Sequence, residues 1–386
     1  MGRRWSEARV KLANLTMTRE NLRWNRHFLR SGDGFKSLWT ELTSTRSSRI
    51  LLICGAGFDP RALAVTHELH NSGIHLDECR LIEFSSGSGL VSSDDLSRAD
   101  EHRRHLGAVF PDDSLIQIQV PMRAEDGRST GGIRISEAFR NPASYAGYSD
   151  VVVDITALPA ELYFPLIATL LKVWEDNDLN ACALGNLHIA VCHNPAVDSI
   201  IQPQGGDKAD MMYGFPGTLQ QASIGNPIRV WAPVLGEHQF GRLERITDYL
   251  GADVVAPVLP FPARDPRRGD ELLLEYRSLI FDTWEVDSGD IIYADEEDPF
   301  DLYTKLLLLS SNYTEALRPI GTVQTVVSSH SSKLHSLGVL LAACEHNFAV
   351  AHVQPTTHDH EAGFGPEHRE GTLFDIWLAG EAYDEV

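Results

Sequence analysis

The stretch Ile50-Leu51-Leu52-Ile53-Cys54-Gly55-Ala56-Gly57 decides the fold. Its unbroken apolar start is typical of a strand buried on both faces, as in a parallel sheet covered by helices. The two glycines allow a tight turn, and a helical pattern follows from Pro60 to about Ser72. Because a buried strand, a glycine turn and a helix make half of a β-α-β unit, we expect a parallel sheet here.

Strands and helices continue to alternate beyond this stretch. Val151-Val152-Val153 has the same continuous apolar character, and Pro and Gly punctuate the chain from 195 to 227 before the alternation restarts. Further strands are expected at 80–84, 116–120, 150–155, 187–192, 228–233, 254–259, 291–293, 323–328 and 349–353. The two halves have similar element orders without a close sequence repeat.

We therefore predict an α/β protein with two tandem Rossmann-like domains whose sheets are mostly parallel. The length of 386 residues fits two domains. The expected divisions are an N-terminal helical extension at 1–46, a Rossmann-like domain at 47–195, a linker or crossover at 196–227, and a second α/β domain with a C-terminal tail at 228–386. Within these, 19–28 is expected to form an amphipathic helix and 371–378 an added edge strand.

The composition narrows the classes of partner and the compartment. A formal net charge of −21 disfavours direct nucleic-acid binding and anionic membranes. No apolar run approaches the roughly 18 residues of a membrane span, and the first residues lack the apolar segment of a signal peptide. Five cysteines without a CxxC pair fit reduced thiols. We expect an acidic cytoplasmic protein that works with a protein partner or as a homo-oligomer.

The loop after the first strand is the leading candidate for a ligand site, because ligands of open parallel sheets bind beyond the carboxyl ends of the strands. Gly55 and Gly57 permit close approach of a ligand to the backbone. Glu83 ends the next strand, where dinucleotide-binding and methyltransferase folds place a ribose-binding acid. The loop resembles the Rossmann fingerprint in part, with Pro60 at the third glycine position.

Asp59 argues against one class of ligand. Asp before Pro is a strong helix cap, so the Asp59 carboxylate would occupy the N–H groups that otherwise hold a pyrophosphate. A diphosphate of the NAD type is disfavoured, and a nucleoside or S-adenosylmethionine suits the loop better. The alternative is a capped strand-to-helix turn without a ligand.

Polar residues also follow two later strands of the first half. Asp154 and Thr156 end the fourth strand and face the same crevice, at the place where methyltransferase-like folds carry a residue near the transfer centre. The aromatic residue of the usual amino-methyltransferase tetrapeptide is missing, and Asp and Thr are also common helix caps. His193 follows the fifth strand; a lone histidine in a loop is more often a surface residue than a catalyst.

In the second half, a serine-rich turn before a helix is the favoured anion site. Ser329, Ser331 and Ser332 together with Lys333 place hydroxyls, backbone N–H groups and an ammonium where proteins hold phosphate or carboxylate. The glycines of a Walker A loop are missing. The alternative is a serine-rich helix cap.

Two other charged segments in this half are weaker candidates. Arg264 and Arg267 could clamp an anion, or the arginines of this segment could pair with the acidic run at 295–298. His358-Asp359-His360-Glu361 lacks the helical HExxH spacing, so we expect a solvated loop and no metal site.

Three hypotheses for function follow. The first is a sensor or regulatory subunit, of the kind found in prokaryotic regulation or defence, that binds a nucleotide-like or phosphorylated small molecule. The second is an enzyme, either a group transferase that uses S-adenosylmethionine or a hydrolase of nucleotide-like substrates. The third is a catalytically inactive scaffold, whose crevice would be filled by its own side chains, such as Phe58. No catalytic residue is identified.

Overall fold

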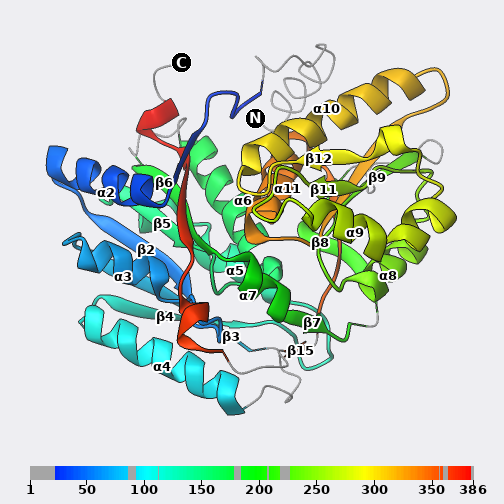
Figure 1. Ribbon diagram of the computed structural model, residues 1–386. Helices are drawn as coiled ribbons and strands as arrows, with labels where there is room; N and C mark the ends of the chain where they lie inside the picture. Colours follow the sequence, from blue (N-terminus) through cyan, green and yellow to red (C-terminus); the bar gives the residue numbers. More distant parts are fainter. Residues whose placement is uncertain are drawn as a thin grey trace.

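The computed structural model describes residues 22–85, 93–111, 113–177, 184–206, 208–217, 227–355, 357–359 and 364–383. The chain is an α/β protein with two mostly parallel sheets interleaved with helices (Figure 1). The predicted fold class, two Rossmann-like domains in tandem, is thereby confirmed.

The first sheet has seven strands in the order β1-β16-β6-β5-β2-β3-β4. Its five central and outer strands β6, β5, β2, β3 and β4 are parallel, whereas β16 runs antiparallel to β6 and β1 antiparallel to β16. Its elements are β1 (Phe28–Ser31), α2 (Asp33–Thr45), β2 (Ile50–Gly55), α3 (Ala64–Asn71), β3 (Glu78–Ser85), α4 (Ser93–Val109), β4 (Leu115–Pro121), α5 (Gly131–Phe139), β5 (Asp150–Asp154), α6 (Ala160–Asn177), β6 (Asn186–His193) and β16 (Thr372–Ala379).

The second sheet has the order β12-β11-β9-β13-β14-β8, with β10 paired to β9. All its pairs are parallel except that of β14 with β8. Its elements are β8 (Ala209–Pro216), β9 (Ile228–Val234), α8 (Phe240–Leu250), β10 (Val254–Val255), β11 (Val258–Pro260), α9 (Arg268–Glu275), β12 (Ile292–Ala294), α10 (Pro299–Leu317), β13 (Val323–Ser329), α11 (Lys333–His346) and β14 (Ala349–Val353). Helix α7 (Pro195–Ile200) and the small pair β7 (Gln202–Gln204) and β15 (Thr357–Asp359) complete the fold.

The strand orders define a switch point in each sheet. In the first unit, β2 to β6, the chain moves from β2 outward to β3 and β4, and then returns to the other side of β2 with β5 and β6. The second unit, β9 to β14, repeats this path, with β11 and β12 on one side of β9 and β13 and β14 on the other. The crevice at such a reversal is where open α/β sheets bind ligands.

The two units exchange their antiparallel edge strands. Strand β8 follows the first unit in the chain but pairs with β14 of the second sheet. Strand β16 follows the second unit but pairs with β6 of the first sheet, as the red strand in Figure 1 shows. The segment 196–227, expected as a linker or crossover, thus contains α7, β7 and β8, and the tail strand expected at 371–378 crosses back to the first sheet. The exchange ties the units together through main-chain hydrogen bonds.

The N-terminal segment differs from the expectation. The helix expected at 19–28 is wrong for its described part, since residues 22–27 form turns and bends and Phe28 begins β1. In the described part of this segment the helix is instead α2, whose sequence is rich in Thr and Ser. It is held by tertiary contacts: Phe35 and Trp39 are fully buried, and the Trp39 indole N–H donates to Asp375 of β16 at 3.1 Å. Packing outweighs weak local propensity here.

One apolar core runs through both units. It joins residues of β2, β5 and α6 to residues of β9, α10 and α11, including Val153, Leu166, Ala232, Leu306 and Leu337. Helix α11 contacts α6 and β6 of the first unit. Within the described ranges, none of the helices has the length and apolarity needed to cross a membrane. The continuous core holds the carboxyl edges of the two sheets against each other.

Candidate functional site

A cavity of about 260 Å³ lies at the switch point of the first sheet. Its walls come from the turn after β2, the end of β3, the start of α4, the end of β4 and the turn after β5, and the second unit closes it with Lys333 and with Gln354 and Pro355 after β14. The lining is mostly apolar and includes Phe58, Phe84, Leu96, Met122, Leu158, Pro159 and Ile201; its polar members include Asp59, Asp95, Arg123, Thr156, Glu161 and Lys333.

The glycines predicted to shape the first turn are needed for close packing. A Cβ on Gly57 would lie 2.6 Å from the carbonyl oxygen of Ala157, and one on Gly55 would lie 2.6 Å from the Leu158 side chain. The turn after β2 therefore fits directly against the turn after β5. His102 of α4 fixes the turn from the other side, with Nδ1 2.8 Å from the Gly57 carbonyl oxygen, to which its ring N–H donates. Gly57 lines the cavity, whereas Gly55 lies behind it.

Asp59 carries a buried ion pair instead of an open cap. Its Oδ1 accepts from the backbone N–H of Arg61 at 2.9 Å and from Nε of Arg61 at 3.0 Å, and Oδ2 accepts from Nη2 at 2.8 Å. The same Nη2 donates to Asp198 of α7 at 2.8 Å. Burial opposes ionisation of Asp59, but the Arg61 guanidinium outweighs it and lowers the pKa of the carboxyl. Helix α3 begins only at Ala64, after a turn.

Asp154 and Thr156 lie at the end of β5, as predicted. Asp154 is 1% exposed; its Oδ1 accepts from the Thr156 N–H at 2.9 Å, and its Oδ2 has no hydrogen-bond partner among the described residues. Burial raises the pKa of Asp154 to about 7. The Thr156 hydroxyl accepts from the Cys192 N–H of β6 at 2.9 Å, so it joins β5 to β6. Thr156 lines the cavity, whereas Asp154 is not part of the lining.

Lys333 brings the second unit into the cavity of the first. Its Nζ donates to the Leu158 carbonyl oxygen at 2.7 Å and lies 5.4 Å from the centre of the Tyr163 ring. Burial lowers the pKa of Lys333, while the nearby carboxylate of Asp59 opposes this shift. Since Lys333 is the first residue of α11, the position of its ammonium group and the orientation of the helix both depend on how the two units pack against each other.

The serines before Lys333 make contacts inside their own turn. Ser332 caps α11 and accepts from the His335 N–H at 3.3 Å. The Ser329 hydroxyl lies 2.7 Å from that of Ser336, and the Ser331 hydroxyl lies 3.2 Å from Nδ1 of His335. Ser332 is thus a helix cap, whereas Ser329 and Ser331 contact side chains of α11. Of the segment 329–333, the cavity is lined by Lys333.

The remaining predicted site residues lie apart from the cavity. Glu83 pairs with Arg103 of α4 at 2.8 Å and with Gln119 of β4. Arg264 pairs with Glu297, and its backbone N–H donates to Glu296 at 2.9 Å. Arg267 is exposed. The arginine segment therefore meets the acidic run at 295–298, as the alternative expected.

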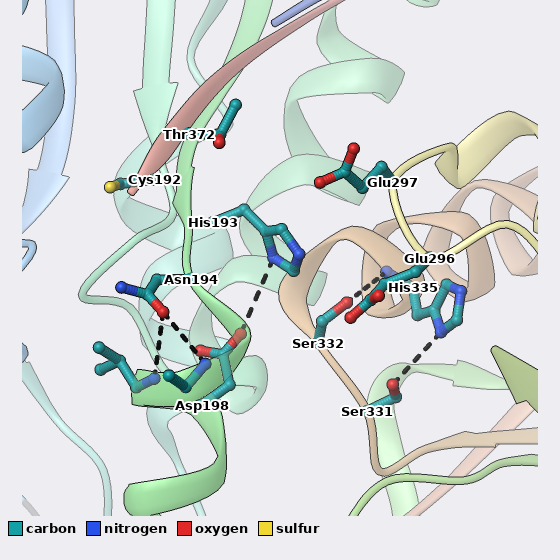
Figure 2. Close-up of polar contacts among 12 residues, drawn as sticks. Cys192, His193, Asn194, Asp198, Glu296, Glu297, Ser331, Ser332, His335 and Thr372 are labelled. Carbon is teal, nitrogen blue, oxygen red and sulfur yellow. Dashed lines mark hydrogen bonds and ion pairs between the residues drawn. The ribbon is translucent and has the colours of Figure 1, made fainter. Parts of the chain in front are cut away.

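His193 was expected to be a surface residue of the rim and is instead 1% exposed. It ends β6 at the seam between the units, opposite the turns that carry Glu296 and Ser332 (Figure 2). Its Nδ1 lies 3.9 Å from Asp198, and neither ring nitrogen has a hydrogen-bond partner among the described residues. Burial lowers the pKa of His193, so the ring is neutral near pH 7.

Sequence reasoning missed a second ionic contact between the units. Glu161, in the first turn of α6, lines the cavity and lies 3.8 Å from Nδ1 of His352 in β14. Burial opposes its ionisation, but the nearby His352 imidazole outweighs this and lowers the pKa of Glu161 to about 2. Arg242 of α8 adds a buried positive charge nearby. The sequence offered one signal for this contact, namely an acidic residue in the otherwise apolar first turn of a helix.

Among the described residues, no group of three or more His, Cys, Asp or Glu side chains is arranged to hold a metal ion. The side chains of His358–Glu361 lie outside the described residues. No protein-family model matches the chain, and no curated protein matches its sequence significantly. The site is therefore interpreted from its own geometry.

Proposed function

We propose that the cavity binds a small nucleotide-like molecule with an anionic group, and that the protein acts as a sensor or regulatory subunit. The observation that carries the proposal is the position of Lys333: an ammonium from the second unit enters the switch-point cavity of the first. A ligand there contacts both units at once. Its binding can therefore favour one relative arrangement of the two units over another, and a sensor requires such a shift.

The chemistry of the walls favours a nucleoside monophosphate over a dinucleotide. A volume of about 260 Å³ is slightly below the roughly 300–1,000 Å³ of pockets for drug-sized ligands. Phe58, Phe84 and Met122 offer apolar and aromatic surface to a base. Lys333 and Arg123 offer positive charge to one phosphate. The Asp59 carboxylate, held on Arg61, opposes a diphosphate at the start of α3.

The scaffold hypothesis fits these walls less well. It expects Phe58 to fill the crevice, whereas Phe58 is one wall of an open cavity. The transferase hypothesis stays open as the alternative, because S-adenosylmethionine combines a nucleoside with charged groups and would meet the same walls. It is therefore included in the test as a competing ligand.

The test is calorimetric titration of the full chain with adenosine, AMP, inorganic phosphate and S-adenosylmethionine, followed by other nucleoside monophosphates. We expect a monophosphate to bind at least roughly tenfold more tightly than its nucleoside. Lys333→Ala should abolish that difference, because the ammonium serves the phosphate. Lys172→Ala is the matched control, since Lys172 is an exposed lysine of α6 outside the lining.

Two outcomes would overturn the proposal. Equal affinities of wild type and Lys333→Ala for the preferred monophosphate would show that Lys333 does not bind the phosphate. Tight binding of S-adenosylmethionine with no binding of any monophosphate would indicate that the cavity serves group-transfer chemistry instead.

A further inference from the structure

His193 and the turns opposite it form a seam between the two units. This seam lies at the switch point of the second sheet, as the cavity lies at the switch point of the first. The cavity lies at the switch point between β2 and β5 and is closed by the residues that follow β14 of the other sheet. The corresponding place in the second sheet is the switch point between β9 and β13. His193, at the end of β6, faces the turn after β13 there (Figure 2).

Two local features repeat between these places. Gly236 follows β9 as Gly57 follows β2, and a Cβ on Gly236 would lie 2.0 Å from the carbonyl oxygen of His330. The run Ala190-Val191-Cys192-His193 in β6 is similar to Ala349-Val350-Ala351-His352 in β14, so that a histidine ends β6 and another lies one residue before the end of β14. Each histidine lies near the opposite unit: His352 near Glu161 of α6, and His193 opposite the turn after β13.

Neither histidine has a hydrogen bond at Nδ1 within the described residues, but their surroundings differ. His352 lies 3.8 Å from Glu161, the second residue of α6, and its side chain is 17% exposed. The second residue of α11 is Leu334, which is fully buried and offers no carboxylate. The nearest acid to His193 is Asp198, and its distance of 3.9 Å is beyond a hydrogen bond.

A buried imidazole without partners is costly. Leaving a buried polar group unpaired destabilises the folded state, and buried polar groups in folded proteins are paired as a rule. His193 is 1% exposed, and both of its ring nitrogens lack a partner among the described residues. The seam thus carries one ring donor and one ring acceptor for a group from outside the chain.

The charges around the seam select the class of that group. Carboxylates of Asp198, Glu296 and Glu297 face His193, with Arg264 and His335 as the other titratable neighbours. The Arg264 guanidinium is held by Glu297, and Arg268 pairs with Glu237 and Glu296. Asp198 is likewise paired with Arg61. Because each of these arginines is already held by a carboxylate, none of them is left to bind a negatively charged group, which is therefore disfavoured.

We propose that the seam around His193 is a second binding site, which takes the hydroxyl or ammonium group of a small molecule without negative charge. A hydroxyl can donate to one imidazole nitrogen or carboxylate and accept from the other ring nitrogen, and an ammonium can donate to Asp198 or Glu297 and to the ring. Arg61 lies between the two places: it pairs with Asp59, which lines the cavity, and with Asp198, which lies beside His193. Each switch point then has its own ligand chemistry.

The test follows the imidazole signals of the full chain, labelled with ¹⁵N-histidine, by NMR during separate titrations with D-ribose, methylammonium chloride and sodium phosphate at constant ionic strength. His193→Gln assigns the His193 signals, with His193→Asn as the second choice if the first variant does not fold. His75→Gln is the matched control, because its side chain is 85% exposed. The His102 ring, which contacts Gly57, reports the first cavity in the same spectra.

We expect D-ribose or methylammonium to shift the His193 signals with a saturable curve, and phosphate to bind there roughly tenfold more weakly or not at all. Three results would overturn the proposal: no probe shifts His193, phosphate is the preferred probe, or the shifts are confined to His102. None of these results depends on whether the first cavity binds a nucleotide.

Discussion

Replacing Arg61 with methionine should destabilise the protein strongly. The Arg61 guanidinium is 1% exposed and serves Asp59 and Asp198 at once, with three contacts of 2.8 to 3.0 Å. Methionine keeps the reach of the side chain but removes its charge, so the buried carboxylate of Asp59 and the partly buried carboxylate of Asp198 lose their partner. Removing one partner of a buried ion pair costs about 3–5 kcal/mol.

This cost can be read as a shift in melting temperature. A loss of 1 kcal/mol lowers the melting temperature of a domain of 150–250 residues by roughly 2–4 °C. We therefore expect Arg61→Met to melt roughly 6–20 °C below wild type at pH 7, measured by circular dichroism. Arg267→Met is the matched control: Arg267 is exposed, and a surface change of this kind stays within about 0.5 kcal/mol.

A triple variant separates lost charge pairing from lost packing. When Asp59→Asn and Asp198→Asn accompany Arg61→Met, no unpaired charge is left behind, and most of the stability should return. An Arg61→Met protein that melts within about 2 °C of wild type would refute the reasoning, because the ion pair would then carry no net stability. A triple variant no more stable than the single one would assign the loss to packing.

Two further predictions concern packing and pH. Gly57→Ala should lower the free energy of unfolding by about 1–3 kcal/mol and weaken ligand binding, because its Cβ would lie 2.6 Å from the Ala157 carbonyl oxygen. Gly107→Ala in α4, where nothing lies within 4 Å, should be neutral or stabilising. Denaturant unfolding of both variants compares the two sites. Burial alone would lower the pKa of His188, but the carboxylates of Asp375 and Asp150 outweigh it and raise the pKa to about 9. The stability that this charged ring contributes is therefore complete below pH 6.5 and is lost as the pH rises through about 9. Melting temperatures from pH 6 to 10 should fall more steeply for wild type than for His188→Gln, and parallel curves would contradict the assignment.

The parallel strands were predictable because they are apolar on both faces and short. Strands expected at 50–54, 228–233 and 349–353 agree with the structure to within a residue or two. Their order was not visible in the sequence, because tertiary packing decides which strand lies beside which. The exchange of β8 and β16 between the sheets is likewise a long-range effect that no local pattern encodes.

The candidate site was predictable in its first half only. Glycine turns and strand ends have local signals, so Gly57, Asp59 and Thr156 were identified from the sequence and line the cavity. Glu83 was placed by analogy with other folds, and its side chain turns to Arg103 instead. The entry of Lys333 into the first unit depends on how two distant helices pack, which periodicity does not reveal.

The burial of His193 has the same origin. As a residue after a strand it had the pattern of an exposed loop, yet the second unit covers it because the carboxyl edges of both sheets face each other. Polar residues at strand ends therefore acquire unusual environments in this fold. The raised pKa of Asp154 and the lowered pKa values of Lys333 and His193 all arise from burial where the two units meet.

The most direct test of the central claim is native mass spectrometry of the protein purified from its own host, with denaturing release of any bound molecule. We expect wild type to carry a nucleotide-like mass, either as purified or after incubation with a nucleotide panel, and Lys333→Ala and Gly57→Ala to have lost it. A wild-type protein that stays free of ligand through the whole panel, or a Lys333→Ala protein that retains the same mass at the same occupancy, would contradict a nucleotide site between the two units.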